Sequence, residues 1–142
     1  MFKYRKKYND LIDKIIRLKA TKEIYTEHLK LIYEASDGND KIKLSAKIKA
    51  ASDLIELLSE ILTHCEEKIG GIFNYRKKYE GLYRNIYLLK EATRVQRDQF
   101  KWRIDFNGSP AYSVEERSQL EGLYEHATKL IIELNNILGI KV

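Results

Sequence analysis

One short motif of cations and tyrosines occurs twice, and it is the pattern in this sequence best suited to bind a charged partner. Residues 2–8 read FKYRKKY and residues 73–79 read FNYRKKY, so six of seven positions agree at an offset of 71. Cations attract phosphates and carboxylates, and tyrosines supply an apolar ring with a polar hydroxyl. The motif therefore predicts a surface that binds nucleic acid or an acidic protein.

The place of the motif strengthens this interpretation. Each copy begins a predicted helix, where the macrodipole disfavours each cation by ~0.3–1 kcal/mol, so helix stability does not explain the cations. In an up-down-up-down bundle the first and third helices are parallel, which puts both copies at the same end. The cations of the expected cluster are Arg5, Lys6, Lys7, Arg76, Lys77 and Lys78. The alternative is that the four tyrosines belong mainly to the core and the cations only solvate the helix ends.

A second basic pattern follows one face of the third predicted helix, next to its apolar seam. This stripe consists of Arg76, Tyr83, Tyr87, Lys90, Arg94, Arg97 and Lys101. A basic line with interleaved aromatic rings is suited to follow a phosphate backbone and to stack on bases, at ~1–3 kcal/mol per base. The alternative is an ordinary solvated face on which Tyr83 and Tyr87 widen the core.

Chemistry other than binding has little support in the sequence. No glycine-rich phosphate loop, GxSxG motif or Cys/His nucleophile pair occurs. Glu60 and His64 lie one helical turn apart, which gives at most two clustered ligands where a zinc site needs three or four. We therefore expect a protein that is not an enzyme and that has no catalytic residue, metal or cofactor.

Two single residues have structural interpretations. Cys65 lies on an apolar seam and is expected to be a small buried hydrophobe. Trp102 is expected to join a core cluster at the end of the bundle rather than to anchor a partner. The other members of this cluster would be Phe100, Ile104 and Phe106.

The elements that position these residues are helices, because apolar residues recur with a period of about 3.5 residues. The apolar seams of the four expected helices span residues 4–32, 44–69, 75–100 and 120–137. Lys22 is the one polar interruption in the seam of the first helix. Gly81 and Gly122 lie inside helices at a cost of ~1 kcal/mol each, for which close helix contacts are the expected reason.

Turn-forming and capping residues set the expected ends of these helices. Breaks are predicted at residues 36–40 and 107–110, which are dense in turn formers. Glycines at 70–71 should end the second helix and Gly139 the fourth. Ser113 should cap the fourth helix, with Glu116 completing a capping box.

The repeat organises the whole chain. From residue 2 onward, ten of 18 positions are identical at the offset of 71, and the second parts align more weakly at an offset of 69. We expect an all-α fold, an antiparallel four-helix bundle built from two tandem, duplicated helical hairpins of residues 2–70 and 73–139. Residues 1–142 would form a single domain. The alternatives are two extended hairpins, or helix packing between chains as in a homodimer.

Composition excludes several classes of protein. The chain has 142 residues, a formal net charge of +5 and one cysteine, so a disulfide scaffold is excluded. No run reaches the ~18 apolar residues of a membrane span, and the N-terminus lacks the apolar core of a secretory signal. We expect a cytoplasmic protein without a membrane partner.

Two functional hypotheses remain. The first is a non-enzymatic helical protein that binds nucleic acid through the basic and tyrosine face on the first helix of each hairpin, without strong sequence specificity. The second is a protein–protein interaction module, such as an adaptor, an inhibitor of an acidic partner or a self-assembling subunit, because tyrosine and arginine are also favoured at protein interfaces. The repeated YRKKY motif favours the first.

Overall fold

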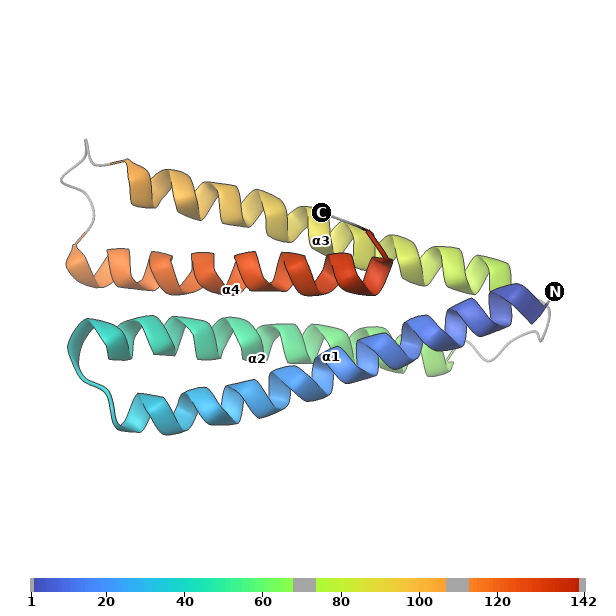
Figure 1. Cartoon of the computed structure of the whole chain (residues 1–142), viewed down its shortest axis with the longest axis horizontal. Coiled ribbons are helices and arrows are strands. Elements are labelled where there is room, and N and C mark those ends of the chain that lie inside the picture. The colour runs from blue at the N-terminus through green and yellow to red at the C-terminus, as the bar shows by residue number, and fades with distance from the viewer. Residues whose placement is uncertain (1, 68–73, 107–112, 141–142) are drawn as a thin grey trace.

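The computed structural model describes residues 2–67, 74–106 and 113–140, and within these ranges the chain forms helices and short links between them and has no strand. The helices are α1 (Phe2–Glu34), α2 (Gly38–Glu67), α3 (Tyr75–Asp105) and α4 (Val114–Leu138). The prediction of an all-α fold is confirmed, and the arrangement is compatible with a helical bundle (Figure 1).

The helices run alternately up and down along one long axis (Figure 1). α1 packs on α2, α3 packs on α4, and α2 and α4 pack on each other between them. α1 and α3 meet where both helices begin, beyond the end of the shorter α4, and separate toward their C-terminal ends (Figure 1). In the described ranges no Cα atom of α2 lies within 8 Å of one in α3.

The core consists of the apolar seams that the sequence predicts. Ile15 and Ile86 occupy equivalent repeat positions on α1 and α3 and are both fully buried, as are Leu58 and Leu134 on the inner helices. The seam of α1 ends earlier than predicted, because Ile32 is 39% exposed. At that end α1 has moved away from α3, so only α2 covers it.

The described helix ends correct one prediction and confirm two. The break at 36–40 is shorter than expected, because α2 already begins at Gly38. A left-handed φ of +59° at Gly38 turns the chain there, and the Ser36 hydroxyl donates to the Ile32 carbonyl at 2.7 Å. Ser113 caps α4 by accepting from the Glu116 amide, and Gly139 ends α4 with a φ of +72°. The predicted breaks at 70–71 and 107–110 lie outside the described residues.

The two glycines inside helices differ. At Gly122 α4 approaches α2 closely, because a Cβ atom there would lie 2.6 Å from the carbonyl oxygen of Lys43. The expectation of a close helix contact is therefore confirmed at this position. It is wrong for Gly81, which faces open space and has nothing within 4 Å of the corresponding point.

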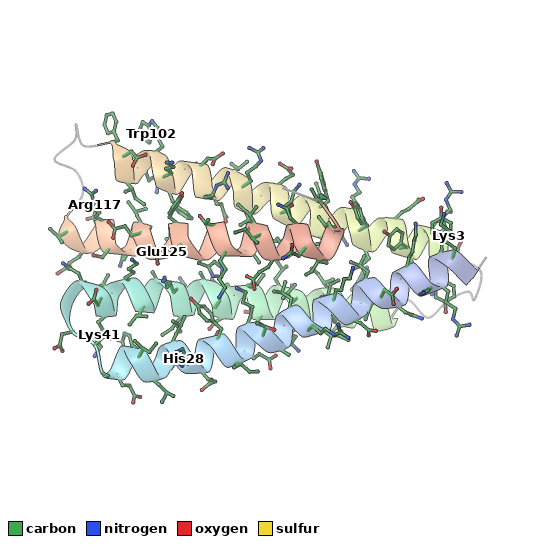
Figure 2. The ribbon with its side chains drawn as sticks, in the orientation of Figure 1. Lys3, His28, Lys41, Trp102, Arg117 and Glu125 are labelled. Carbon is green, nitrogen blue, oxygen red and sulfur yellow. The ribbon has the colours of Figure 1, made fainter. Side chains whose placement is uncertain are left out.

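Charged side chains reinforce the α2–α4 contact. Glu125 of α4 lies between these helices and forms ion pairs with Lys43 and Lys47 of α2 (Figure 2). These pairs lower the pKa of Glu125 below its usual value, against the opposing effect of its partial burial. Among the described helices, none has the length and apolarity needed to cross a membrane.

Candidate functional site

Both YRKKY segments lie at the same end of the molecule, where α1 and α3 begin (Figure 1). Their tyrosines contact each other crosswise. The rings of Tyr4 and Tyr79 are 6.3 Å apart between centroids, and those of Tyr8 and Tyr75 are 5.9 Å apart. Tilted ring pairs at such distances are favourable arrangements of aromatic side chains. The helices thus meet through a layer of tyrosines, which brings the two sets of cations together.

The tyrosine layer is partly a structural core, as the alternative interpretation proposed. Tyr8 is buried, whereas Tyr4, Tyr75 and Tyr79 are half-buried. Burial raises the pKa of Tyr8 to about 12, with a smaller contribution from the neighbouring Cys65. Cys65 itself is half-buried rather than fully buried. Because the rings pack on one another, their faces are largely occupied within the protein.

Two arginines reach across from one helix to the ring of the other. The Arg5 guanidinium of α1 lies 5.8 Å from the ring centroid of Tyr75 on α3. The Arg76 guanidinium of α3 lies 5.6 Å from the ring centroid of Tyr4 on α1. A cation within about 6 Å of a ring face is attracted to it. The two arginines therefore lie over the tyrosine layer, where the faces of Tyr75 and Tyr4 attract their positive charge.

Two lysines also lie beside rings, Lys7 beside one ring on each helix and Lys78 beside a ring of its own helix. The Lys7 ammonium lies 5.6 Å from the ring centroid of Tyr4 and 5.7 Å from that of Tyr79. The Lys78 ammonium lies 5.2 Å from the ring centroid of Tyr75. Lys7 remains exposed and Lys78 half-buried. We call the six cations of the two motifs the end cluster; they are Arg5, Lys6, Lys7, Arg76, Lys77 and Lys78.

Few carboxylates neutralise the cations of the end cluster. Arg76 pairs with Glu80 at 3.0 Å. The other five cations have no carboxylate within 4 Å among the described residues, and neither does the neighbouring Lys3 at the same end (Figure 2). Uncompensated positive charge is concentrated at this end and is available for an anionic partner.

The stripe on α3 is mostly neutralised within its own helix. Arg94 pairs with Glu91 at 2.9 Å and with Asp98 at 3.6 Å, and Arg97 pairs with Asp98 at 3.1 Å. Lys90 also reaches Glu91, at 3.4 Å. Lys101 is exposed and has no carboxylate partner in the described part of the chain.

The two tyrosines of the stripe have different surroundings. Tyr83 is half-buried, and its ring lies 5.9 Å from that of Tyr79, so it extends the tyrosine layer. Tyr87 is 40% exposed, with the Lys90 ammonium 4.5 Å from its ring centroid. Of this pair, Tyr87 has the more accessible ring.

The prediction of a core cluster at the C-terminal end of α3 is wrong for Trp102 and Phe106, whereas its other members, Phe100 and Ile104, are half-buried. Trp102 is 62% exposed and Phe106 is 47% exposed, and their rings stack on each other at 4.9 Å outside the bundle (Figure 2). The reason is that Trp102 continues an outer line of apolar residues on α3. Val95 and Leu88, respectively seven and fourteen residues before it, are also about half exposed.

A buried charge cluster, which the sequence did not predict, lies between α1 and α4. Lys22 is only 1% exposed and forms an ion pair with Glu133. The ring of Tyr25 lies beside the ammonium groups of both Lys22, at 5.4 Å, and Lys129, at 4.2 Å. The signal in the sequence was a lysine at a position of α1 where the pattern requires an apolar residue.

His126 is subject to the positive charge of this cluster, and we expect it to make the fold sensitive to acid. Burial, together with the positive charges of Lys22, Lys129 and Lys47, lowers the pKa of His126 from 6.5 to about 4. Because the pKa of His126 is lower in the folded state than in the unfolded state, its contribution to stability is fully present above pH 6.5 and is lost as the pH falls toward 4.

We expect the free energy of unfolding to fall by about 1–3 kcal/mol over this range because of His126. Urea unfolding at pH 7, 6, 5 and 4 measures this loss. His126→Gln should remove most of the dependence between pH 6.5 and 4.5, a range above the titration of Glu125. An unchanged pH profile in the variant would assign the loss to other groups.

Neither clustered metal ligands nor similarity to known proteins indicates a further site. In residues 2–67, 74–106 and 113–140, no three His, Cys, Asp or Glu side chains come together as metal ligands would. No protein-family model matches the chain, and no match is found among curated proteins or solved structures.

Proposed function

We propose that this protein binds nucleic acid through the end cluster, by contacts to phosphates and without strong sequence specificity. The observation that carries the proposal is the concentration of six cations where α1 and α3 begin, five of them without a carboxylate partner among the described residues. Positive groups without internal partners can neutralise phosphates and release counterions, which supplies most non-specific affinity for nucleic acid. The stripe on α3 contributes less in this proposal, because Arg94 and Arg97 are already paired.

The architecture in this proposal is a single domain of two duplicated hairpins, residues 2–70 and 73–139. Its support is the similar burial of repeat-equivalent residues. Leu11 and Leu82 are 4% and 3% exposed, and Ile15 and Ile86 are both fully buried. Duplication places two copies of one basic helix start at the same end of a bundle, which doubles the positive charge there.

Fluorescence anisotropy with labelled single-stranded DNA, duplex DNA and RNA, from ~50 to 200 mM salt, tests this function. We expect binding that weakens steeply with salt. The triple variant Arg5→Ala, Lys6→Ala and Lys77→Ala should lose most of the affinity, and its salt slope should fall by roughly two to three.

A matched control exists on the same helix bundle. The triple variant Arg94→Ala, Arg97→Ala and Lys101→Ala removes the same net charge from the stripe, and we expect it to retain most of the affinity. Equal losses in the two triple variants would contradict a localised site and indicate attraction by overall charge. Absence of binding at the lowest salt would overturn the proposal.

A protein-interaction module is the second candidate, and one observation favours it. Leu88, Val95, Trp102 and Phe106 form an exposed apolar line on the outer side of α3. Tryptophan is often a hot spot of protein interfaces, and such exposed lines mark contact sites. Light scattering of the parent protein and of the Trp102→Ala variant tests this candidate. An oligomer that the substitution dissociates into monomers supports it.

Whichever function holds, we propose a cytoplasmic setting, because the one cysteine cannot form an internal disulfide.

A further inference from the structure

The end cluster is symmetric in its contacts. At the repeat offset of 71, Tyr4 corresponds to Tyr75 and Tyr8 to Tyr79. The contact between Tyr4 and Tyr79 therefore has its counterpart in the contact between Tyr75 and Tyr8, and the two centroid distances are 6.3 and 5.9 Å. Exchanging the two helices leaves the pair of contacts unchanged.

The cations obey the same exchange. Arg5 lies over Tyr75 at 5.8 Å, and its counterpart Arg76 lies over Tyr4 at 5.6 Å. Lys7 lies over the tyrosine three residues before it at 5.6 Å, and its counterpart Lys78 does the same at 5.2 Å. The interhelical contacts between rings and those between arginines and rings are thus each related to a counterpart by one operation, which is an approximate twofold rotation. The interhelical Lys7–Tyr79 contact at 5.7 Å has no counterpart in the described part of the chain.

The direction of this axis follows from the topology. α1 and α3 begin at the same end and run the same way (Figure 1). A twofold rotation that exchanges two parallel helices must have its axis along them. The axis therefore passes between α1 and α3 and leaves the molecule through the end cluster, with one set of three cations on each side.

A DNA duplex offers the matching symmetry. Its two antiparallel backbones are related by twofold axes perpendicular to the duplex, whatever the sequence, whereas a single strand has no such axis. Packed helices have axes ~8–10 Å apart, and the minor groove between the two backbones is ~6 Å wide. Cations carried on the two helices are thus spaced to reach one backbone each.

Resting on the proposed function, we infer that the nucleic acid is a DNA or other duplex, which the end cluster binds with its approximate twofold axis on a dyad of the duplex. Each YRKKY segment then contacts the phosphates of one strand. The tyrosine layer supports a duplex over a single strand, because rings that pack on each other offer few free faces for stacking on bases.

The test compares two equivalent charge reversals, Lys6→Glu and Lys77→Glu. Both side chains are exposed and have no ion pair in the described part of the chain, so neither substitution removes a contact that the fold uses. Anisotropy is measured with a labelled DNA duplex of about two helical turns and with one of its strands alone. We expect the duplex to bind at least about tenfold more tightly than the strand, and each reversal to weaken duplex binding by a similar factor of about ten.

Each outcome decides one of the two proposals. A strand that binds as tightly as the duplex overturns the duplex inference and leaves nucleic-acid binding intact. A large loss in one reversal with little in the other overturns the symmetric placement. No binding to either probe overturns the proposed function itself. Tighter binding of the duplex than of the strand, similar losses for the two reversals and one protein bound per short duplex together support the dyad-centred complex.

Discussion

Replacing Lys22 by methionine is expected to destabilise the fold by about 3–5 kcal/mol. Methionine keeps most of the volume of the lysine but removes its charge. Glu133, which is 19% exposed, would then keep a largely desolvated carboxylate without its partner. Its Oε1 atom is buried, and the ion pair with Lys22 compensates for the loss of water there. Urea unfolding at pH 7, followed by circular dichroism, measures the loss.

The double variant Lys22→Met and Glu133→Met separates charge from packing. A buried ion pair is often replaceable by apolar residues at little cost, whereas removing one partner is expensive. The double variant should therefore recover most of the stability that the single variant loses. If the two variants were equally unstable, the cost would lie in packing at position 22 and the role assigned to Glu133 would be wrong.

The sequence predicted this region only in part, and the reason is physical. A period of 3.5 residues shows which face of α1 turns inward, but it does not show which helix lies opposite. Lys22 could be recognised as a polar residue on the buried face. Its partner Glu133 follows from the packing of α1 against α4, which depends on distant contacts.

The outer face of α3 shows a second limit. Leu82 and Leu89 recur after seven residues on the inner seam, and so do Val95 and Trp102 on the outer line. Two faces of one helix therefore carry the same apolar period, so the pattern alone did not determine which face Trp102 shares. The neutralisation of the stripe was easier to predict from the sequence, because acidic residues three or four positions from Arg94 predict ion pairs along a helix.

The position of both YRKKY segments at one end was predictable, because successive helices of the bundle run in opposite directions. Helices one and three of an alternating bundle start at the same end whatever their side chains are. The crosswise contacts between the tyrosines were not predictable at this level. They depend on the angle at which α1 and α3 converge beyond the end of α4.

Substitution of Gly122 by alanine is expected to cost about 1–3 kcal/mol, although alanine is the better helix former. The added Cβ atom would lie 2.6 Å from the carbonyl oxygen of Lys43, which belongs to the backbone of α2 and cannot rotate away. The two helices must move apart, and this shift also disturbs the ion pairs that Glu125 makes with α2. Urea unfolding of the purified variant measures the loss.

Gly81 supplies the matched control for this prediction. It also lies inside a helix, but nothing is within 4 Å of the place where its Cβ atom would be. Gly81→Ala should therefore stabilise the protein by ~1 kcal/mol, the difference in helix propensity. Opposite signs at the two glycines would show that the α2–α4 contact is as close in solution as in the structure. If both substitutions stabilised the protein, the close approach at Gly122 would be contradicted, and the inner pair of helices would pack more loosely than described.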